Sequence, residues 1–158
     1  MIHLTVEKRY QAAGIDRQVR RAAELTLENQ GVDPQVALSV IVTGDQKLKK
    51  LNEKFRSEAR ATDVLSFPSG EFGAEMRSGY LRDVVISLPR ARAQAKGGGH
   101  RLHEELQLLT VHGILHLLGH DHAGPQEKSR MWAAQDEILS KLGVSIQSPV
   151  TEPSNLEP

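Results

Sequence analysis

Several residue and segment types are missing from this chain, and each absence excludes a class of protein. Its 158 residues include no cysteine, so no disulfide can form and any bound metal must be held by nitrogen and oxygen. Aromatic residues make up only 4%, which leaves few side chains for stacking nucleic-acid bases. The N-terminus lacks the apolar core of a signal peptide, and no stretch approaches the roughly 18 apolar residues of a membrane span. We therefore expect a soluble, cytoplasmic protein without a membrane partner.

Net charge is also absent, because 20 basic residues balance 20 acidic ones. This balance excludes a strong overall field for nucleic acid but permits a local basic patch. Residues 46–60 hold six basic and two acidic side chains, and residues 88–101 hold four basic and no acidic ones. Both runs are compatible with solvated helix faces and with a track for the phosphates of a polyanion, and the sequence leaves the choice open.

The most informative stretch is residues 104–122, EELQLLTVHGILHLLGHDH. Apolar residues on every side predict a helix that is buried almost all round. His112 and His116 are four residues apart, so they share one face of that helix. Gly119 supplies the left-handed residue that ends a helix, and His122 can then return to the same point. The pattern H-x3-H-x2-G-x2-H therefore predicts a three-histidine metal site at the end of a buried central helix.

Zinc is the expected metal, one ion per chain, because three neutral imidazoles with an open fourth position suit catalytic zinc. Another divalent transition metal would suit the same ligands. The spacing is that of the metzincin proteases, in which a glutamate that acts as general base follows the first histidine. Here that residue is Gly113, so the protease base is missing. We expect His120 to point away from the metal, and His120 and Asp121 remain candidates for a general base or for a residue that supports the ligands.

Periodicity predicts an α+β domain. Strands are expected at 2–6, 37–42, 63–67 and 84–87, and helices at 16–30 (with Asp16 as N-cap), 45–55, 89–96, 104–118 and 125–142. This order favours a small mixed four-stranded sheet with about five helices packed on it, in one domain over residues 1–147. Residues 148–158 have almost nothing to bury and are expected to be a disordered tail.

Four motifs carry a resemblance to a known family. They are, in order, LNEKFR (51–56), TDVLSFP (62–68), RDVVIS (82–87) and HGILHLLGHDH (112–122). Over residues 1–142 the chain resembles the YbeY family of bacterial metal-dependent endoribonucleases, and the last motif is highly specific. Two positions depart from the family pattern. Arg82 replaces a glycine, which we expect to alter a turn, and His120 replaces a tyrosine.

The resemblance implies a zinc-dependent, single-strand-specific endoribonuclease that acts in 16S rRNA 3′-end maturation and ribosome quality control. It assigns the metal ligands to His112, His116 and His122, and a catalytic arginine to Arg56, whose fork of donors suits a phosphate. The implied partners are single-stranded RNA or rRNA and the ribosome or its small subunit with assembly factors. No specificity for DNA is expected.

Two other functions remain open at this point. A metallopeptidase-like zinc hydrolase is favoured by the histidine spacing alone and opposed by Gly113. A non-catalytic ribosome-assembly factor would use the metal to stabilise its fold. For the nuclease, attack by water and attack by the 2′-hydroxyl of the RNA are both compatible with the sequence.

Overall fold

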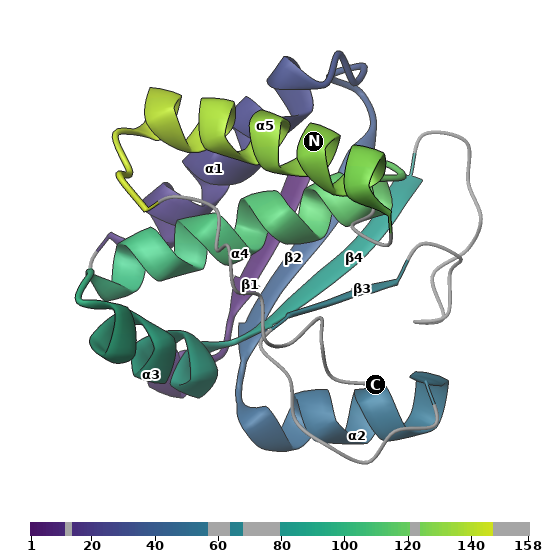
Figure 1. Cartoon of the computed structure of the whole chain (residues 1–158). Coiled ribbons are helices and arrows are strands. Elements are labelled where there is room, and N and C mark those ends of the chain that lie inside the picture. Colours follow the sequence, from purple (N-terminus) through teal and green to yellow (C-terminus); the bar gives the residue numbers. More distant parts are fainter. Residues whose placement is uncertain (12–13, 57–63, 68–79, 121–123, 147–158) are drawn as a thin grey trace.

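The computed structural model (Figure 1) describes residues 1–11, 14–56, 64–67, 80–120 and 124–146. Four strands form one sheet in the order β1-β2-β4-β3: β1 (Ile2–Val6), β2 (Ala37–Thr43), β3 (Val64–Phe67) and β4 (Tyr80–Ser87). The first three in this order are parallel, and β3 runs antiparallel to β4 at the edge. The expected α+β class is confirmed, with a mixed sheet that contains three parallel strands.

Strand β4 begins four residues earlier than the expected start at residue 84, at Tyr80. The register with β2 shows why the sequence pattern missed this part. Ala37 is opposite Tyr80 but Leu38 is opposite Arg82, so one extra residue is inserted between these two pairs. Such a bulge breaks the strict alternation by which a strand is recognised. It also places Arg82 within a strand, so the expectation of an altered turn at this position was wrong.

The described residues form five α-helices, the expected number: α1 (Ile15–Asn29), α2 (Asp45–Arg56), α3 (Leu88–Gly98), α4 (Leu102–Leu117) and α5 (Pro125–Leu142). Helices α1 to α4 contact the sheet, and α5 packs on α1 and α4. A short 3₁₀ helix (Lys8–Tyr10) follows β1. The expected N-cap of α1 was wrong. Gly14, at φ 90°, is the N-cap, and Asp16 lies in the first turn, where a carboxylate favours the positive end of the helix dipole. None of the described helices is long and apolar enough to cross a membrane.

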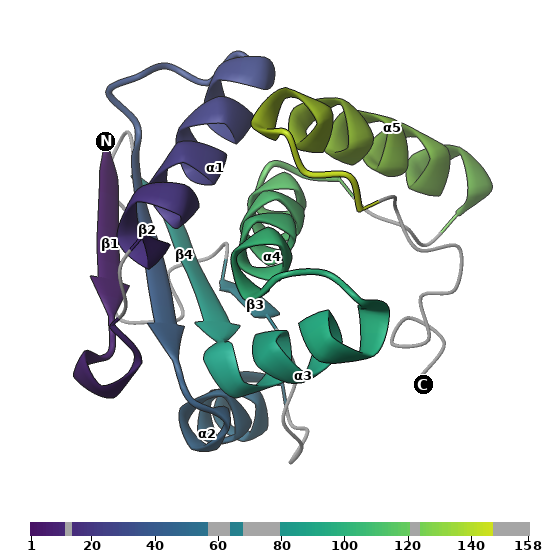
Figure 2. The same cartoon turned by 90° about the vertical axis from the view of Figure 1, so that its left-hand side faces the viewer.

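Alternation along β2 and β4 divides the interior between the two faces of the sheet. Val40 and Val84 are fully buried in the main core, with side chains of α1 and α4. Val85, one position further along β4, packs instead with Leu48 of α2. Since neighbouring residues of a strand point to opposite faces, α2 covers the face of the sheet opposite to α1 and α4. Figures 1 and 2 show α4 between the sheet and α5.

The central position of α4 confirms the expected helix that is buried almost all round. Ten of its residues are buried, among them the fully buried Leu106, Val111 and Ile114. The helix contacts β3, β4 and the three helices α1, α3 and α5. Because apolar neighbours surround it, any polar side chain on α4 must find a partner on one of these elements.

A buried carboxylate joins the start of α4 to the end of α3. The side chain of Glu105 is only 4% exposed, and its Oε1 lies 2.5 Å from Nε2 of His100. Its Oε2 accepts a hydrogen bond of 3.1 Å from Nε2 of Gln94. Between these residues, Gly99 ends α3 in the left-handed conformation at φ 75°. Both carboxylate oxygens therefore have partners on the α3 side of this tight connection.

Candidate metal centre

The two histidines of α4 lie against each other, as their spacing predicts. The ring centroids of His112 and His116 are 4.7 Å apart, and the ring planes meet at 79°. Both side chains are half-buried, whereas Gly113, Ile114 and Leu115 between them are buried. The two imidazoles thus form the accessible polar side of an otherwise apolar segment.

A buried glutamine on α5 holds the first histidine. Nδ1 of His112 lies 3.0 Å from Oε1 of Gln135, a residue that is 1% exposed. An amide oxygen can only accept, so Nδ1 donates the hydrogen and the neutral ring presents its lone pair at Nε2. Metal-ligating histidines are usually held in this way, with the other ring nitrogen donating to an oxygen. The hydrogen bond therefore leaves Nε2 as the nitrogen of His112 that could hold a metal.

Two α5 residues beside His112 were missed by the sequence analysis. Gln135 is one, and the other is Trp132, whose ring centroid lies 5.8 Å from that of His112 with the planes at 36°. They are three residues apart and share a face of α5. The only sign of Gln135 in the sequence was that it is a polar residue among the apolar positions of an amphipathic helix. Nothing in the sequence indicated that it would contact His112.

The chain turns after His116 as the glycine predicted. Gly119 has φ 100°. Its backbone N–H donates to the carbonyl of His116 at 3.0 Å, and the N–H of His120 donates to the carbonyl of Leu115 at 2.9 Å. These two bonds form a Schellman motif, which satisfies the last carbonyls of the helix. The predicted end of α4 at Gly119 is thus confirmed, three residues before the predicted third ligand, His122.

The predicted third ligand, His122, lies outside the described residues, as does Asp121. Within the described ranges no three histidine or carboxylate side chains come together as a metal site. The two histidines that are described fit the chemistry of zinc. Tetrahedral zinc at about 2.0–2.1 Å from each nitrogen holds two nitrogens about 3.4 Å apart. Rings 4.7 Å apart, one of them already in the ligand tautomer, are compatible with this separation.

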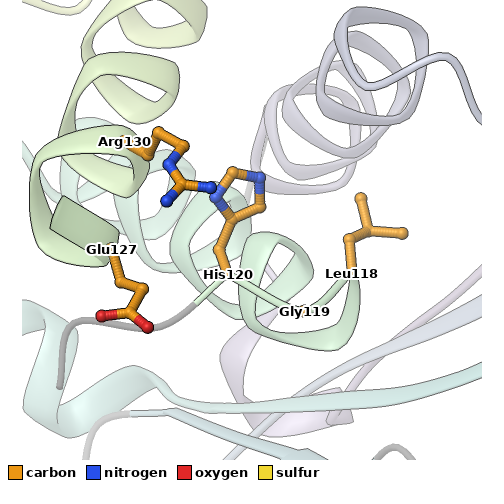
Figure 3. Close-up of a pocket in the computed structure, with 5 residues that line it drawn as sticks. All are labelled: Leu118, Gly119, His120, Glu127 and Arg130. Carbon is orange, nitrogen blue, oxygen red and sulfur yellow. The ribbon is translucent and has the colours of Figure 1, made fainter. Parts of the chain in front are cut away.

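His120 makes its hydrogen bond to a different element. Its Nε2 lies 2.9 Å from Oε1 of Gln30, the residue that caps the end of α1. Partial burial lowers the pKa of His120, and the positive charge of Arg130 on α5 lowers it further. Both effects favour the neutral imidazole. Figure 3 shows the ring of His120 at a small pocket between the end of α4 and the start of α5.

Comparison with known proteins decides the family. A family model described as Endoribonuclease YbeY matches residues 2–143. The chain is 42% identical over 127 residues to the Endoribonuclease YbeY of Renibacterium salmoninarum, covering 77% of this chain and 81% of that protein. It is 45% identical over 132 residues to the Endoribonuclease YbeY of Aquifex aeolicus, covering 81% and 84%.

The chain belongs to the YbeY family. This confirms the resemblance that the four sequence motifs indicated, and it makes the chain a member of a family of endoribonucleases. The fold agrees with a solved structure, the solution structure of TM1509 from Thermotoga maritima. That structure has a TM-score of 0.60 and 25% sequence identity, and the match covers 90% of this chain and 89% of the other.

The arginine that the YbeY motif assigns to catalysis is the last residue of α2. The side chain of Arg56 lies outside what the structure describes, so its role stays a prediction. Helix α2, which carries this residue, packs on the face of the sheet opposite to α4.

Proposed function

We propose that this chain is a zinc-dependent endoribonuclease that hydrolyses single-stranded RNA, with His112, His116 and His122 as the metal ligands. The observation that carries the proposal is the hydrogen bond from His112 to buried Gln135. It prepares one nitrogen for a metal beside a second imidazole one helical turn away. Family membership supports the reaction, since the relatives are named endoribonucleases.

When bound, zinc would act as a Lewis acid and lower the pKa of a water to about 7. The remaining requirements fall on side chains of the protein. Arg56 is proposed to hold the phosphate through its planar fork of donors, a geometry that lysine lacks. Gln135 keeps His112 in the tautomer that leaves Nε2 free of its proton. Gly113 supplies no carboxylate, which argues against a peptidase of the metzincin type.

The general base remains a choice among Asp121, His120 and no protein group at all. The hydrogen bond between Nε2 of His120 and Gln30 argues against His120 as the base, because that nitrogen already has a partner on α1. Attack by water leaves a phosphate monoester at the cut, whereas attack by the 2′-hydroxyl leaves a cyclic phosphate. Analysis of the product ends would separate these two routes.

The basic runs found in the sequence lie on two neighbouring helices. Lys47, Lys49 and Lys50 are exposed on α2, and Arg90, Arg92 and Lys96 are exposed on α3. The two helices contact each other and lie at the same end of the molecule (Figures 1 and 2). Arg90 lies 3.6 Å from Asp45, which pairs its charge. The exposed lysines support a track for RNA phosphates rather than two unrelated solvated faces.

A preference for single strands has a physical reason. The histidines are half-buried between α4 and α5, so a flexible strand can reach them, whereas a rigid A-form helix must first be opened. The family resemblance extends the proposal to a cytoplasmic role in 16S rRNA 3′-end maturation and ribosome quality control. On this basis the partners are rRNA, the small ribosomal subunit and its assembly factors, without specificity for DNA.

The test combines metal analysis with RNA cleavage. Purified protein is loaded with zinc and given labelled single-stranded and duplex RNA, with and without a chelator, beside a His116→Ala variant. We expect chelator-sensitive cleavage of the single strand, little cleavage of the duplex, and no cleavage by the variant. If the wild type and His116→Ala both leave the single strand intact, the nuclease is excluded and a non-catalytic assembly factor takes its place.

A further inference from the structure

A small pocket lies at the end of the histidine helix, outside the pair of histidines themselves. It has a volume of about 190 Å³ and is lined by Leu118, Gly119, His120, Glu127 and Arg130. Figure 3 shows the guanidinium of Arg130 extending from α5 toward the ring of His120. The carboxylate of Glu127 is turned away from both. The guanidinium of Arg130 and the imidazole of His120 thus lie together on one side of the pocket.

The ring of His120 is held in place from α1. The amide nitrogen of Gln30 donates to Oδ1 of Asn29 at 2.8 Å, which directs the amide oxygen of Gln30 toward His120. That oxygen lies 2.9 Å from Nε2 of His120, so Nε2 carries the hydrogen. Because this hydrogen bond fixes the ring of His120 beside the guanidinium, the ring restricts the positions that Arg130 can occupy.

Arg130 has no carboxylate to neutralise it within the described part of the chain. The ion pairs found there join other residues, and none involves Arg130. Glu127 is three residues away on the same helix, but its Oε1 is directed at Gly124, where it occupies the space that a Cβ would take. The cation therefore faces the pocket with its charge available for an anion.

We propose that Arg130 binds a phosphate of the RNA next to the scissile one, and that His120 is a positioning residue for Arg130. The proposal rests on the function proposed above and deepens it. His120 precedes the predicted ligand His122 by two residues, so the covalent chain keeps the Cα atoms of these two residues within about 7 Å of each other. A strand whose scissile phosphate lies at the metal can then place a neighbouring phosphate at Arg130.

The direct test is RNA binding in a form of the protein that does not cut. Arg130→Ala and Arg130→Lys are made in the His116→Ala background, and Lys141→Ala serves as the matched control, because it removes a positive charge near the far end of α5. The probe is a short fluorescein-labelled single-stranded RNA, measured by anisotropy across a salt series. We expect Arg130→Ala to weaken binding about tenfold, as for one charge-assisted hydrogen bond. The slope of log K against log salt should fall by about 0.7.

Arg130→Lys should restore the salt slope but only part of the affinity, because lysine keeps the charge and loses the fork. In the zinc-loaded enzyme without the His116 change, Arg130→Ala should raise KM about tenfold and change kcat by less than about twofold. His120→Phe, which keeps a ring without nitrogens, should raise KM less than Arg130→Ala does. It should have no further effect on KM once Arg130 is alanine.

The outcomes separate this inference from the function on which it rests. A wild-type protein that neither binds nor cuts single-stranded RNA overturns both. A wild type that cuts, with Arg130→Ala matching Lys141→Ala in affinity and salt slope, overturns the Arg130 site alone. A lower kcat with unchanged KM and salt slope also overturns it, since a phosphate-binding role acts on KM. Additive effects of His120→Phe and Arg130→Ala exclude the positioning role of His120.

Discussion

Nδ1 of His112 on α4 donates to Oε1 of Gln135 on α5 across a distance of 3.0 Å. The bond joins residues that are 23 positions apart on two helices. It also selects which nitrogen of the imidazole faces outward. It is thus a support for the proposed metal site that comes from the packing of α5 against α4 rather than from the histidine motif itself.

Gln135→Ala should weaken zinc binding by about 10- to 100-fold, the usual effect of removing a partner that orients a ligating histidine. Zinc affinity is measured by competition with a chelating dye. Gln126→Ala, at an exposed position on the same helix, is the control and should bind zinc like the wild type. Equal zinc affinity in the Gln135→Ala and Gln126→Ala proteins would show that the hydrogen bond serves the fold alone.

His112→Ala and His122→Ala should each lower the metal content well below one ion per chain at neutral pH. Each change removes one of three predicted ligands and leaves a two-coordinate site. Elemental analysis of protein purified without added metal is the measurement, and His3→Ala on β1 is the control. Full metal content in both ligand variants would mean that the ion is held elsewhere.

Arg56→Ala should reduce RNA cleavage by about a factor of 100, which corresponds to about 3 kcal/mol of lost transition-state binding. The melting temperature should change by no more than about 2–4 °C, the shift expected for about 1 kcal/mol in a domain of this size. Single-turnover cleavage and thermal unfolding are measured on the same preparation. Full activity in this variant, or a large loss of stability, would argue against a role on the substrate.

Glu105→Ala should destabilise the fold by about 3 kcal/mol, because it leaves His100 and Gln94 facing a buried position without their acceptor. The melting temperature should then fall by about 6–12 °C. Glu137→Ala is the control, since it breaks only an exposed ion pair of 3.8 Å with Lys141 and should cost less than about 1 kcal/mol. Similar melting temperatures for the two variants would contradict a structural role for the Glu105 contacts.

Local patterns in the sequence were sufficient to predict most of the elements and half of the candidate site. The helix that carries His112 and His116, its end at Gly119 and the helix Pro125–Leu142 all appear in the structure where the sequence places them. These features depend on residues three or four positions apart, whose preferences act within a single turn. The family could be recognised for the same reason, since its motifs are short and contiguous.

Only the tertiary structure decided which partners these residues meet. Gln135 is 23 residues from His112, and Gln30 is 90 residues from His120, so no local pattern links either pair. Likewise, the bulge that starts β4 at Tyr80 depends on its register with β2. Hydrogen bonds of this kind form where packing brings distant segments together. That packing determines which nitrogen of His112 carries the hydrogen and where Arg130 lies.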